Sequence, residues 1–393
     1  MKHLIRLIAV LTLMSLMLGA CLSLTACSDG KDTDPEDSIT EAESETDTET
    51  ETDTEAETES TAKSEPVNYV IKNNSDKINI IGRCPVTDLG LISGWSASGF
   101  EMKVKGEGDV TVGALSTTKN ADYLVFVDGE EHSTVTVPTS ATKLTLGLDL
   151  DGEEHIIGFY RITNNEKSLK AATTIFVSVL FNGELCEYES GKKLIEFVGD
   201  SITCGSGLYN NGDFSGTLAY SFTLAQKLGC EHSMVATSGI GVYIGTTRHQ
   251  NAGANMSKYY DLTNYLWSST DRYIAKKKAD LVVINLNTND NDHGGNNNET
   301  EYKAAVNTLI QKVRDVHGDD VKILWVVGMM RSADSNVNNW MKEVLTGLGG
   351  EANGLYVTTV TQNNEGAGTH PDLEANGVVA DELAAYIKSK GLI

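Results

Sequence analysis

A serine that directly follows an apolar run is the first candidate for chemistry. Residues 194–198 read Leu-Ile-Glu-Phe-Val, and Gly199, Asp200 and Ser201 follow them. A strand that ends at Gly-Asp-Ser presents a serine hydroxyl at the edge of a sheet, and Gly199 allows a tight turn. This hydroxyl predicts ester hydrolysis only if a base and oxyanion donors lie in the same domain. Without them, Ser201 would more simply be the N-cap of a helix.

His370 is the candidate base. It lies near the C-terminus between the segment 366–369 and Pro371, in a loop that precedes the last predicted helix. Pro371 restricts His370 to extended backbone, which fixes the direction of its ring. The ordinary pKa of histidine, about 6.5, suits a general base at neutral pH. Ser201 and His370 therefore predict a nucleophile and its base, provided that the fold brings them together.

The oxyanion that forms during ester hydrolysis needs donors, and three candidates follow strand-like runs. They are the backbone N–H of Ser201, the backbone N–H of Gly239 and the side-chain amide of Asn289. Asparagines in loops are usually turn formers, so Asn289 alone predicts little.

Metal and cofactor motifs are weak in this sequence, and we expect no cofactor. Residues 239–245 read GxGxxxG, which is not the dinucleotide fingerprint. Residues 290–295 with Glu301 resemble a calcium loop, but a strand precedes them where a helix should lie. Four cysteines lie after residue 27: Cys84, Cys186, Cys204 and Cys230. Their spacing excludes a cysteine-based zinc site. The sequence does not decide whether they form disulfides or remain free thiols. No GxSxG occurs, which argues against the α/β-hydrolase nucleophile elbow.

Two regions with different hydrophobic periods must position these residues. Residues 67–190 consist of short alternating runs separated by Asp-Gly and Asn-Gly turns, which predicts an antiparallel β-sandwich. Residues 191–393 alternate apolar strands with amphipathic stretches, which is typical of a parallel sheet covered by helices in three layers. The predicted strands are 194–198, 232–236, 281–286, 323–328 and 355–359, and the predicted helices are 218–228, 259–277, 299–317, 337–348 and 377–388.

The first 66 residues are expected to export and tether the protein. Residues 1–27 read as a bacterial lipoprotein signal with Cys27 as the lipidated residue, Cys21 as the alternative, and an ordinary cleaved signal as a further possibility. Residues 28–66 contain 16 acidic residues and two lysines and almost nothing apolar. Such a segment stays disordered and extended, either as a spacer or as a solvating tail. We therefore expect an exported lipoprotein at the bacterial cell surface.

Charge excludes one class of partner. The net charge is −24 for the chain and −12 for residues 67–393, so a nucleic acid partner is not expected. The latter region exceeds the length that one hydrophobic core usually supports, so two domains are expected.

Four short blocks occur in the order and rough spacing of the SGNH hydrolases: 199–203, 238–239, 287–290 and 370–371. Further segments resemble carbohydrate esterase family two: 81–83, 95–99, 126–129 and 195–205. The resemblance implies a jelly-roll domain followed by an SGNH domain of flavodoxin-like fold, acting as an acetyl esterase on plant polysaccharides such as xylan and glucomannan. It also implies Ser201 as nucleophile, His370 as base, and the Ser201, Gly239 and Asn289 groups as oxyanion hole, with no metal.

The sequence departs from the SGNH pattern at three positions. Ala367 stands where most members carry an aspartate that orients the histidine. Some members of the resembling family also lack this aspartate and use a backbone carbonyl, so the resemblance implies a Ser201–His370 dyad held in that way. Glu365 or Asp372 could supply that contact instead. Asn287 replaces a glycine and is expected to narrow the pocket floor, and the pair 375–376 leaves the anchoring of the histidine loop open.

These features predict a surface-tethered, monomeric esterase that acts on acetylated polysaccharides or oligosaccharides. Two alternatives remain. One is a carbohydrate-binding lipoprotein that has lost turnover, and the other is an esterase for cell-wall O-acetyl groups or lipid esters.

Overall fold

The computed structural model describes residues 65–163, 173–209, 214–246, 254–264, 270–291, 298–330 and 335–393. The signal segment, Cys21, Cys27 and all of the acidic segment up to residue 64 lie outside these residues. Among the described residues, no helix has the length and apolar content needed to cross a membrane.

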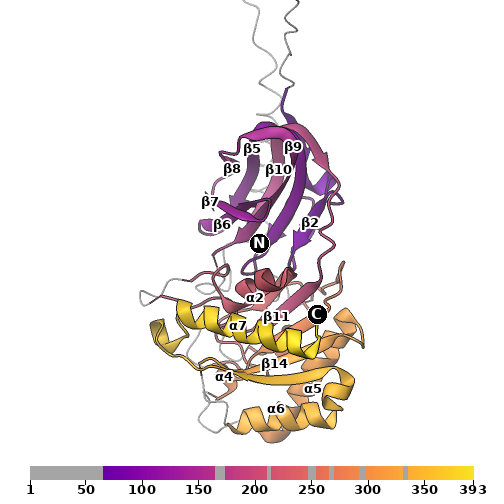
Figure 1. Ribbon diagram of the computed structural model, residues 1–393, viewed down its shortest axis with the longest axis vertical. Coiled ribbons are helices and arrows are strands. Elements are labelled where there is room, and N and C mark those ends of the chain that lie inside the picture. Colours follow the sequence, from indigo (N-terminus) through magenta and orange to yellow (C-terminus); the bar gives the residue numbers. More distant parts are fainter. Residues whose placement is uncertain are drawn as a thin grey trace, which may run out of the picture. The chain divides into compact units, whose positions relative to one another are not determined.

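The first region forms an antiparallel β domain of ten strands (Figure 1). The strand order is β3-β4-β10-β5-β9-β6-β7, with β1 paired to β10 and with β2 and β8 paired to β5. The strands are β1 (Val67–Val70), β2 (Ile78–Ile81), β3 (Val86–Thr87), β4 (Gly90–Ser93), β5 (Gly99–Ser116), β6 (Ala121–Val127), β7 (Glu130–Val137), β8 (Thr142–Thr145), β9 (Leu150–Arg161) and β10 (Thr174–Cys186). A short 3₁₀ helix, η2 (Ile71–Asn73), follows β1. Phe100, Phe159 and Phe176 pack at the centre of its apolar core.

The longest strand of this domain is β5. It joins the alternating runs 100–105 and 110–112 in one strand of 18 residues. Its pairing with β10 and β9 is interrupted by register shifts, which bend a long strand. Gly106 lies in this stretch, where a Cβ atom would approach the Asn182 carbonyl oxygen to 2.3 Å.

The second region forms a five-stranded parallel sheet with the order β12-β11-β13-β14-β15. The strands are β11 (Leu194–Gly199), β12 (Glu231–Ala236), β13 (Leu281–Asn285), β14 (Lys322–Gly328) and β15 (Leu355–Val360). This is the flavodoxin-like order. In such sheets ligands bind beyond the carboxyl ends of the strands, at the point between β11 and β13 where the strand order reverses. The predicted parallel α/β fold is therefore confirmed, with strand boundaries within one residue of expectation.

Helices cover both faces of this sheet (Figure 1). On one face lie α2 (Tyr220–Leu228) and α7 (Leu373–Lys390), and on the other lie α5 (Glu299–His317) and α6 (Asn336–Gly347). The short helices are α3 (Met256–Tyr259), α4 (Thr288–Asn291), η3 (Gly350–Asn353) and η4 (Ala367–Thr369). The expected boundaries of α5 are confirmed residue for residue, because Asn298 caps its first turn and Gly318 ends it.

The helix predicted at 259–277 is not found in the described residues of that range, 259–264 and 270–277. Only Tyr259, the last residue of α3, is helical among them, and Leu262 forms an isolated bridge with Arg272. Side chains of the β domain bind the carbonyl groups that a helix would need. Arg83 donates to the carbonyl oxygens of Tyr260 and Leu262, and Trp95 donates to that of Thr263. Tertiary hydrogen bonds therefore override the local helical pattern.

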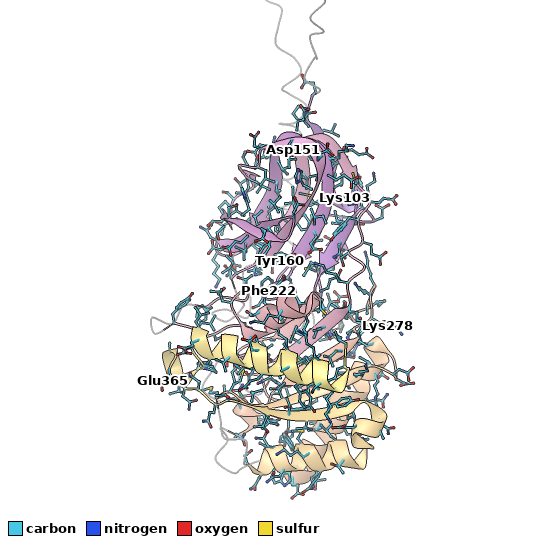
Figure 2. All side chains as sticks on the ribbon, in the orientation of Figure 1. Lys103, Asp151, Tyr160, Phe222, Lys278 and Glu365 are labelled. Atoms are coloured by element: carbon cyan, nitrogen blue, oxygen red, sulfur yellow. The ribbon has the colours of Figure 1, made fainter. Side chains whose placement is uncertain are left out.

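The β domain and the parallel sheet meet at an aromatic cluster. Tyr160 of β9 faces Phe222 of α2 at the junction, with ring centroids 5.6 Å apart (Figure 2). The ring of His232, in β12, lies 5.0 Å from that of Phe222, and its Nε2 bonds the Ala97 carbonyl oxygen at 2.8 Å. These contacts fix the β domain against the sheet that carries the candidate site.

A buried ion pair also joins the two regions. Glu196, in β11, is fully buried and accepts hydrogen bonds from Arg83 at 2.8 and 3.2 Å, from Tyr260 at 2.6 Å and from Ser233 at 2.9 Å. His317 Nε2 donates to it at 3.0 Å. Burial by itself would raise the pKa of Glu196, but the Arg83 and His317 contacts hold it below its usual range.

Replacing Glu196 by alanine is expected to lower the free energy of unfolding by about 3–5 kcal/mol, because Arg83 would stay buried without its counter-ion. Urea unfolding measures this change. The matched control is Lys390→Ala, which removes an exposed surface pair with Glu351 and should leave the unfolding midpoint almost unchanged. Equal unfolding midpoints for the two variants would contradict the role given to this ion pair.

Candidate active site

Ser201 lies at the end of β11, in a turn that covers residues 201–207. Its side chain is buried, and the N–H of Ser206 donates to the Ser201 carbonyl oxygen at 2.9 Å. Gly199 is required before it, because a Cβ atom there would lie 2.0 Å from the Thr203 hydroxyl oxygen. No helix begins at Ser201, since the next described helix is α2, so the N-cap interpretation is wrong.

His370 follows η4 in a loop with unusual backbone geometry. Gly368 and Thr369 both have positive φ, at 65° and 63°. A β-branched residue rarely adopts this conformation, and such strain is typical of functional loops. The ring of His370 is held by a hydrogen bond of 3.0 Å between Nδ1 and the carbonyl oxygen of Ala367. Because a carbonyl only accepts, Nδ1 carries the proton and Nε2 presents a lone pair.

The environment of His370 favours its neutral form. Burial lowers the pKa of His370 below its usual value, and backbone carbonyls only partly oppose this effect.

The two carboxylates proposed as alternative partners do not bond the ring. Asp372 caps α7 by accepting from the N–H of Ala375 at 2.9 Å, and Glu365 lies at the exposed end of the loop (Figure 2).

Backbone contacts join the serine turn to the histidine loop. The N–H of Ala367 donates to the Gly207 carbonyl oxygen at 3.0 Å, and the N–H of Leu373 donates to that of Leu208 at 3.1 Å. Gly207 packs so closely on the histidine that an added Cβ would lie 2.7 Å from His370 Cβ. The fold therefore joins the two loops as a dyad requires, and the contact between the serine hydroxyl and the imidazole stays a prediction.

Replacing Gly207 by alanine is expected to lower kcat/KM for an aryl acetate by about 10- to 100-fold, because the new methyl group must displace His370. The matched control is Gly191→Ala. Gly191 has a similar positive φ, 63° against 67°, but nothing lies within 4 Å of its added Cβ. Steady-state kinetics of both variants measures the effect, and equal losses would attribute it to backbone strain alone.

The candidate oxyanion donors gather around the same turn. Gly239 has a positive φ of 80° and lies beside Ser238, whose hydroxyl is 3.0 Å from that of Ser206. Asn289 is in α4, and its amide nitrogen donates to the Ile240 carbonyl oxygen at 2.8 Å and to Asp200 at 3.2 Å. Within the described residues, the N–H groups of Ser201 and Gly239 donate no hydrogen bond. Both N–H groups are therefore available to a ligand.

Two buried aspartates position these donors, and the sequence did not single them out for this task. Asp290 accepts from the N–H groups of Val242, Tyr243 and Ile244 at 2.8–3.0 Å. It thus holds the loop after Gly239, which explains the glycine-rich spacing there. Burial raises the pKa of Asp200 to about 7, opposed by the Ile202 N–H and reinforced by the charge of Asp290. Asp200 in turn accepts from Asn289.

The calcium interpretation of this loop receives no support. The oxygens of Asp290 are engaged by backbone N–H groups, as described above. Residues 292–297 lie outside the described part of the chain, and elsewhere in that part no group of three metal-ligating side chains occurs.

The two other departures from the SGNH pattern find structural explanations. Asn287 has a φ of 87°, a conformation that glycine and asparagine tolerate best. Its amide group bonds Tyr302 of α5 at 2.6 Å and Asn338 of α6 at 2.8 Å, so this side chain is held by the two helices. The expected narrowing of the pocket floor stays a prediction. Asn376 anchors the histidine loop, since it accepts from the Tyr220 N–H at 2.9 Å and donates to the Asp372 carbonyl oxygen at 2.8 Å.

Four cysteines lie in the described residues, and none of them forms a disulfide bond there: Cys84, Cys186, Cys204 and Cys230. Burial raises the pKa of Cys84 to about 12, so this residue is an inert core thiol.

Two family models match the chain. The Carbohydrate esterase 2 N-terminal model matches residues 80–185, and the GDSL-like Lipase/Acylhydrolase model matches residues 195–345. The first match covers most of the β domain, and the second contains the candidate serine, glycine and asparagine. The fold and the site thus define a two-domain hydrolase of the SGNH type.

Known proteins agree with this class. The chain is 28% identical over 317 residues to the Cellulase/esterase CelE of Acetivibrio thermocellus, covering 75% of this chain and 37% of that protein. A family two carbohydrate esterase from Clostridium thermocellum, solved with cellohexaose, is similar with a TM-score of 0.69 and 24% identity, over 80% of this chain and all of that one. The acetyl xylan esterase Est2A from Butyrivibrio proteoclasticus has a TM-score of 0.71 and 21% identity, over 84% of this chain and all of that one.

Because the two solved structures are less than 25% identical to this chain in sequence, their similarity shows a shared fold. Together, the two family models span about two thirds of the chain. The chain therefore carries a Carbohydrate esterase 2 N-terminal domain followed by a GDSL-like lipase/acylhydrolase domain.

Proposed function

We propose that this protein removes O-acetyl groups from polysaccharides such as xylan and glucomannan through a Ser201–His370 dyad. The observation that carries the proposal is the hydrogen bond from His370 Nδ1 to the Ala367 carbonyl oxygen. It replaces the orienting aspartate of most SGNH enzymes and leaves Nε2 as the base. The acetyl xylan esterase and the cellohexaose-bound esterase described above support a sugar ester as substrate.

The reaction takes two steps. The Ser201 oxygen attacks the ester carbonyl while His370 Nε2 takes its proton, and the N–H groups of Ser201 and Gly239 with the Asn289 amide stabilise the oxyanion. His370 returns the proton to the departing sugar oxygen as the bond to the carbonyl carbon breaks. Water then attacks the acetyl-enzyme while His370 takes a proton from it, and His370 returns that proton to the Ser201 oxygen as the bond from this oxygen to the acetyl carbon breaks and acetate leaves. Asn289 must turn one N–H from Asp200 towards the oxyanion.

Acetate release from a panel of acetylated polymers tests the proposal. The panel contains acetylated xylan, acetylated glucomannan, O-acetylated peptidoglycan and a lipid ester. We expect fastest release from the two plant polymers. Preference for peptidoglycan or lipid would assign the same mechanism to another substrate. Binding of glycans without hydrolysis at any pH would instead favour a carbohydrate-binding protein.

We also propose that the protein is exported and anchored through a lipid on Cys27, with the acidic segment as spacer. The sequence of residues 1–66 supports this placement. Mass spectrometry of the mature N-terminus from the membrane fraction tests it. A lipidated Cys27 is expected. Lipid on Cys21 would move the anchor, and an unmodified N-terminus in the medium would contradict anchoring.

A further inference from the structure

A hollow of about 560 Å³ lies between the β domain and the segment that follows the serine turn. This volume is within the range of small-molecule binding sites. The β domain contributes one wall, made of Lys119, Asp122, Leu124, Glu131, Thr134, Ile162 and Thr163. The segment after Ser201 contributes the other, made of Tyr209, Phe214, Ser215, Thr217 and Leu218.

This hollow adjoins the candidate active site. Gly207 packs against His370, and Tyr209 is two residues further along the chain, within about 7 Å of backbone. The N–H of Ser215 donates to the Gly205 carbonyl oxygen at 3.0 Å, which ties the hollow to the serine turn. The N–H of Gly216 donates to the Ile162 carbonyl oxygen at 2.9 Å, which ties it to the β domain. One wall is therefore tied to the turn that carries Ser201, and the other belongs to the β domain.

The chemistry of the walls suits sugar rings. Tyr209 and Leu218 are 40% and 38% exposed, which is unusual for large apolar side chains in this fold. Leu373, 39% exposed, adjoins them through its bond to Leu208. An exposed aromatic ring offers a flat apolar surface to the C–H face of a sugar. Threonine hydroxyls can donate hydrogen bonds to the sugar hydroxyl groups or accept from them, and carboxylates accept from them.

We propose that this hollow is a binding subsite for the sugar residues that flank the acetylated residue, so that the β domain takes part in polysaccharide recognition. The proposal rests on the function proposed above. Its charged side chains are two carboxylates and one lysine, Asp122, Glu131 and Lys119, so a neutral glycan fits it better than an acidic one. A polymer would thus be bound from the serine turn to the edge strand β7.

Binding of non-acetylated oligosaccharides tests the subsite separately from turnover. Xylohexaose and cellohexaose are titrated calorimetrically into the full chain carrying Ser201→Ala. In that background, Thr134→Trp fills the hollow from β7, and Tyr209→Ala removes its ring. We expect each change to weaken the Kd of the better-bound oligosaccharide by about tenfold or more.

The matched control is Thr145→Trp, which places the same side chain at another exposed threonine of the β domain, on β8. It should leave the Kd at the value of the parent. Equal Kd values for Thr134→Trp and Thr145→Trp would overturn the subsite, as would no binding of either oligosaccharide by the parent. Failure of the esterase proposal would appear elsewhere, as turnover that survives loss of the Ser201 hydroxyl.

Discussion

Replacing Ser201 by alanine lowers kcat for acetate release by about four to six orders of magnitude, because no other group can form the acetyl-enzyme. Ser201 is buried in a tight turn, and the substitution removes only its side-chain oxygen. We therefore expect the surrounding fold to stay intact. Turnover of 4-nitrophenyl acetate and of acetylated xylan measures the loss. Both substrates should lose activity together, since both need the same nucleophile.

The matched control is Ser389→Ala, which removes an exposed hydroxyl at the end of α7. Its turnover should equal that of the unaltered protein. Ester hydrolysis that survives in the Ser201 variant at more than about one tenth of the normal rate would assign the nucleophile to another residue.

Replacing His370 by alanine is expected to lower kcat by about four orders of magnitude or more, because the serine would lose the base that takes its proton. The pH profile of the unaltered protein gives an independent test. Burial lowers the pKa of His370, so more than half of it is neutral at pH 6.5. The activity should therefore fall with decreasing pH along a limb whose midpoint lies below 6.5, and the alanine variant should lack that limb.

The same profile distinguishes a dyad from a triad. A carboxylate that bonded His370 Nδ1 would raise its pKa and move the limb above 6.5. Glu365→Gln is the matched variant, since Glu365 is an exposed residue of the histidine loop. We expect unchanged kcat and an unchanged limb. A midpoint above 6.5 that falls in the Glu365 variant would contradict the backbone-carbonyl dyad.

The sequence predicted those parts of the fold that depend on local pattern. The five parallel strands and α5 follow from apolar runs with clear caps, and Gly-Asp-Ser follows the first of these strands directly. Ser201, Gly239, Asn289 and His370 could be chosen because parallel strands place their carboxyl ends at one edge of the sheet.

What the sequence could not predict depends on contacts between distant residues. The helix expected at 259–277 is absent from the described residues of that range because Arg83 and Trp95 bind carbonyl groups from another domain. A backbone carbonyl bonded to His370 was expected from the family resemblance, but the choice of Ala367 could not be predicted, because every residue of the loop carries a carbonyl group. The position of this carbonyl group is set by the backbone of the histidine loop. Asn376 ties that loop to α2, because its side-chain oxygen accepts a hydrogen bond from the N–H of the first residue of α2.

The central claim is that the Ser201 hydroxyl and the His370 imidazole act on each other, and the rate of covalent labelling tests it most directly. An organophosphate that phosphorylates serine is applied across pH 4–9, and intact-mass spectrometry follows the labelling of Ser201. We expect labelling that rises with pH along a limb whose midpoint lies below 6.5, and labelling about 1,000-fold slower or more at neutral pH in the His370→Ala variant. Labelling at equal rates in both proteins, or labelling at another serine, would contradict it.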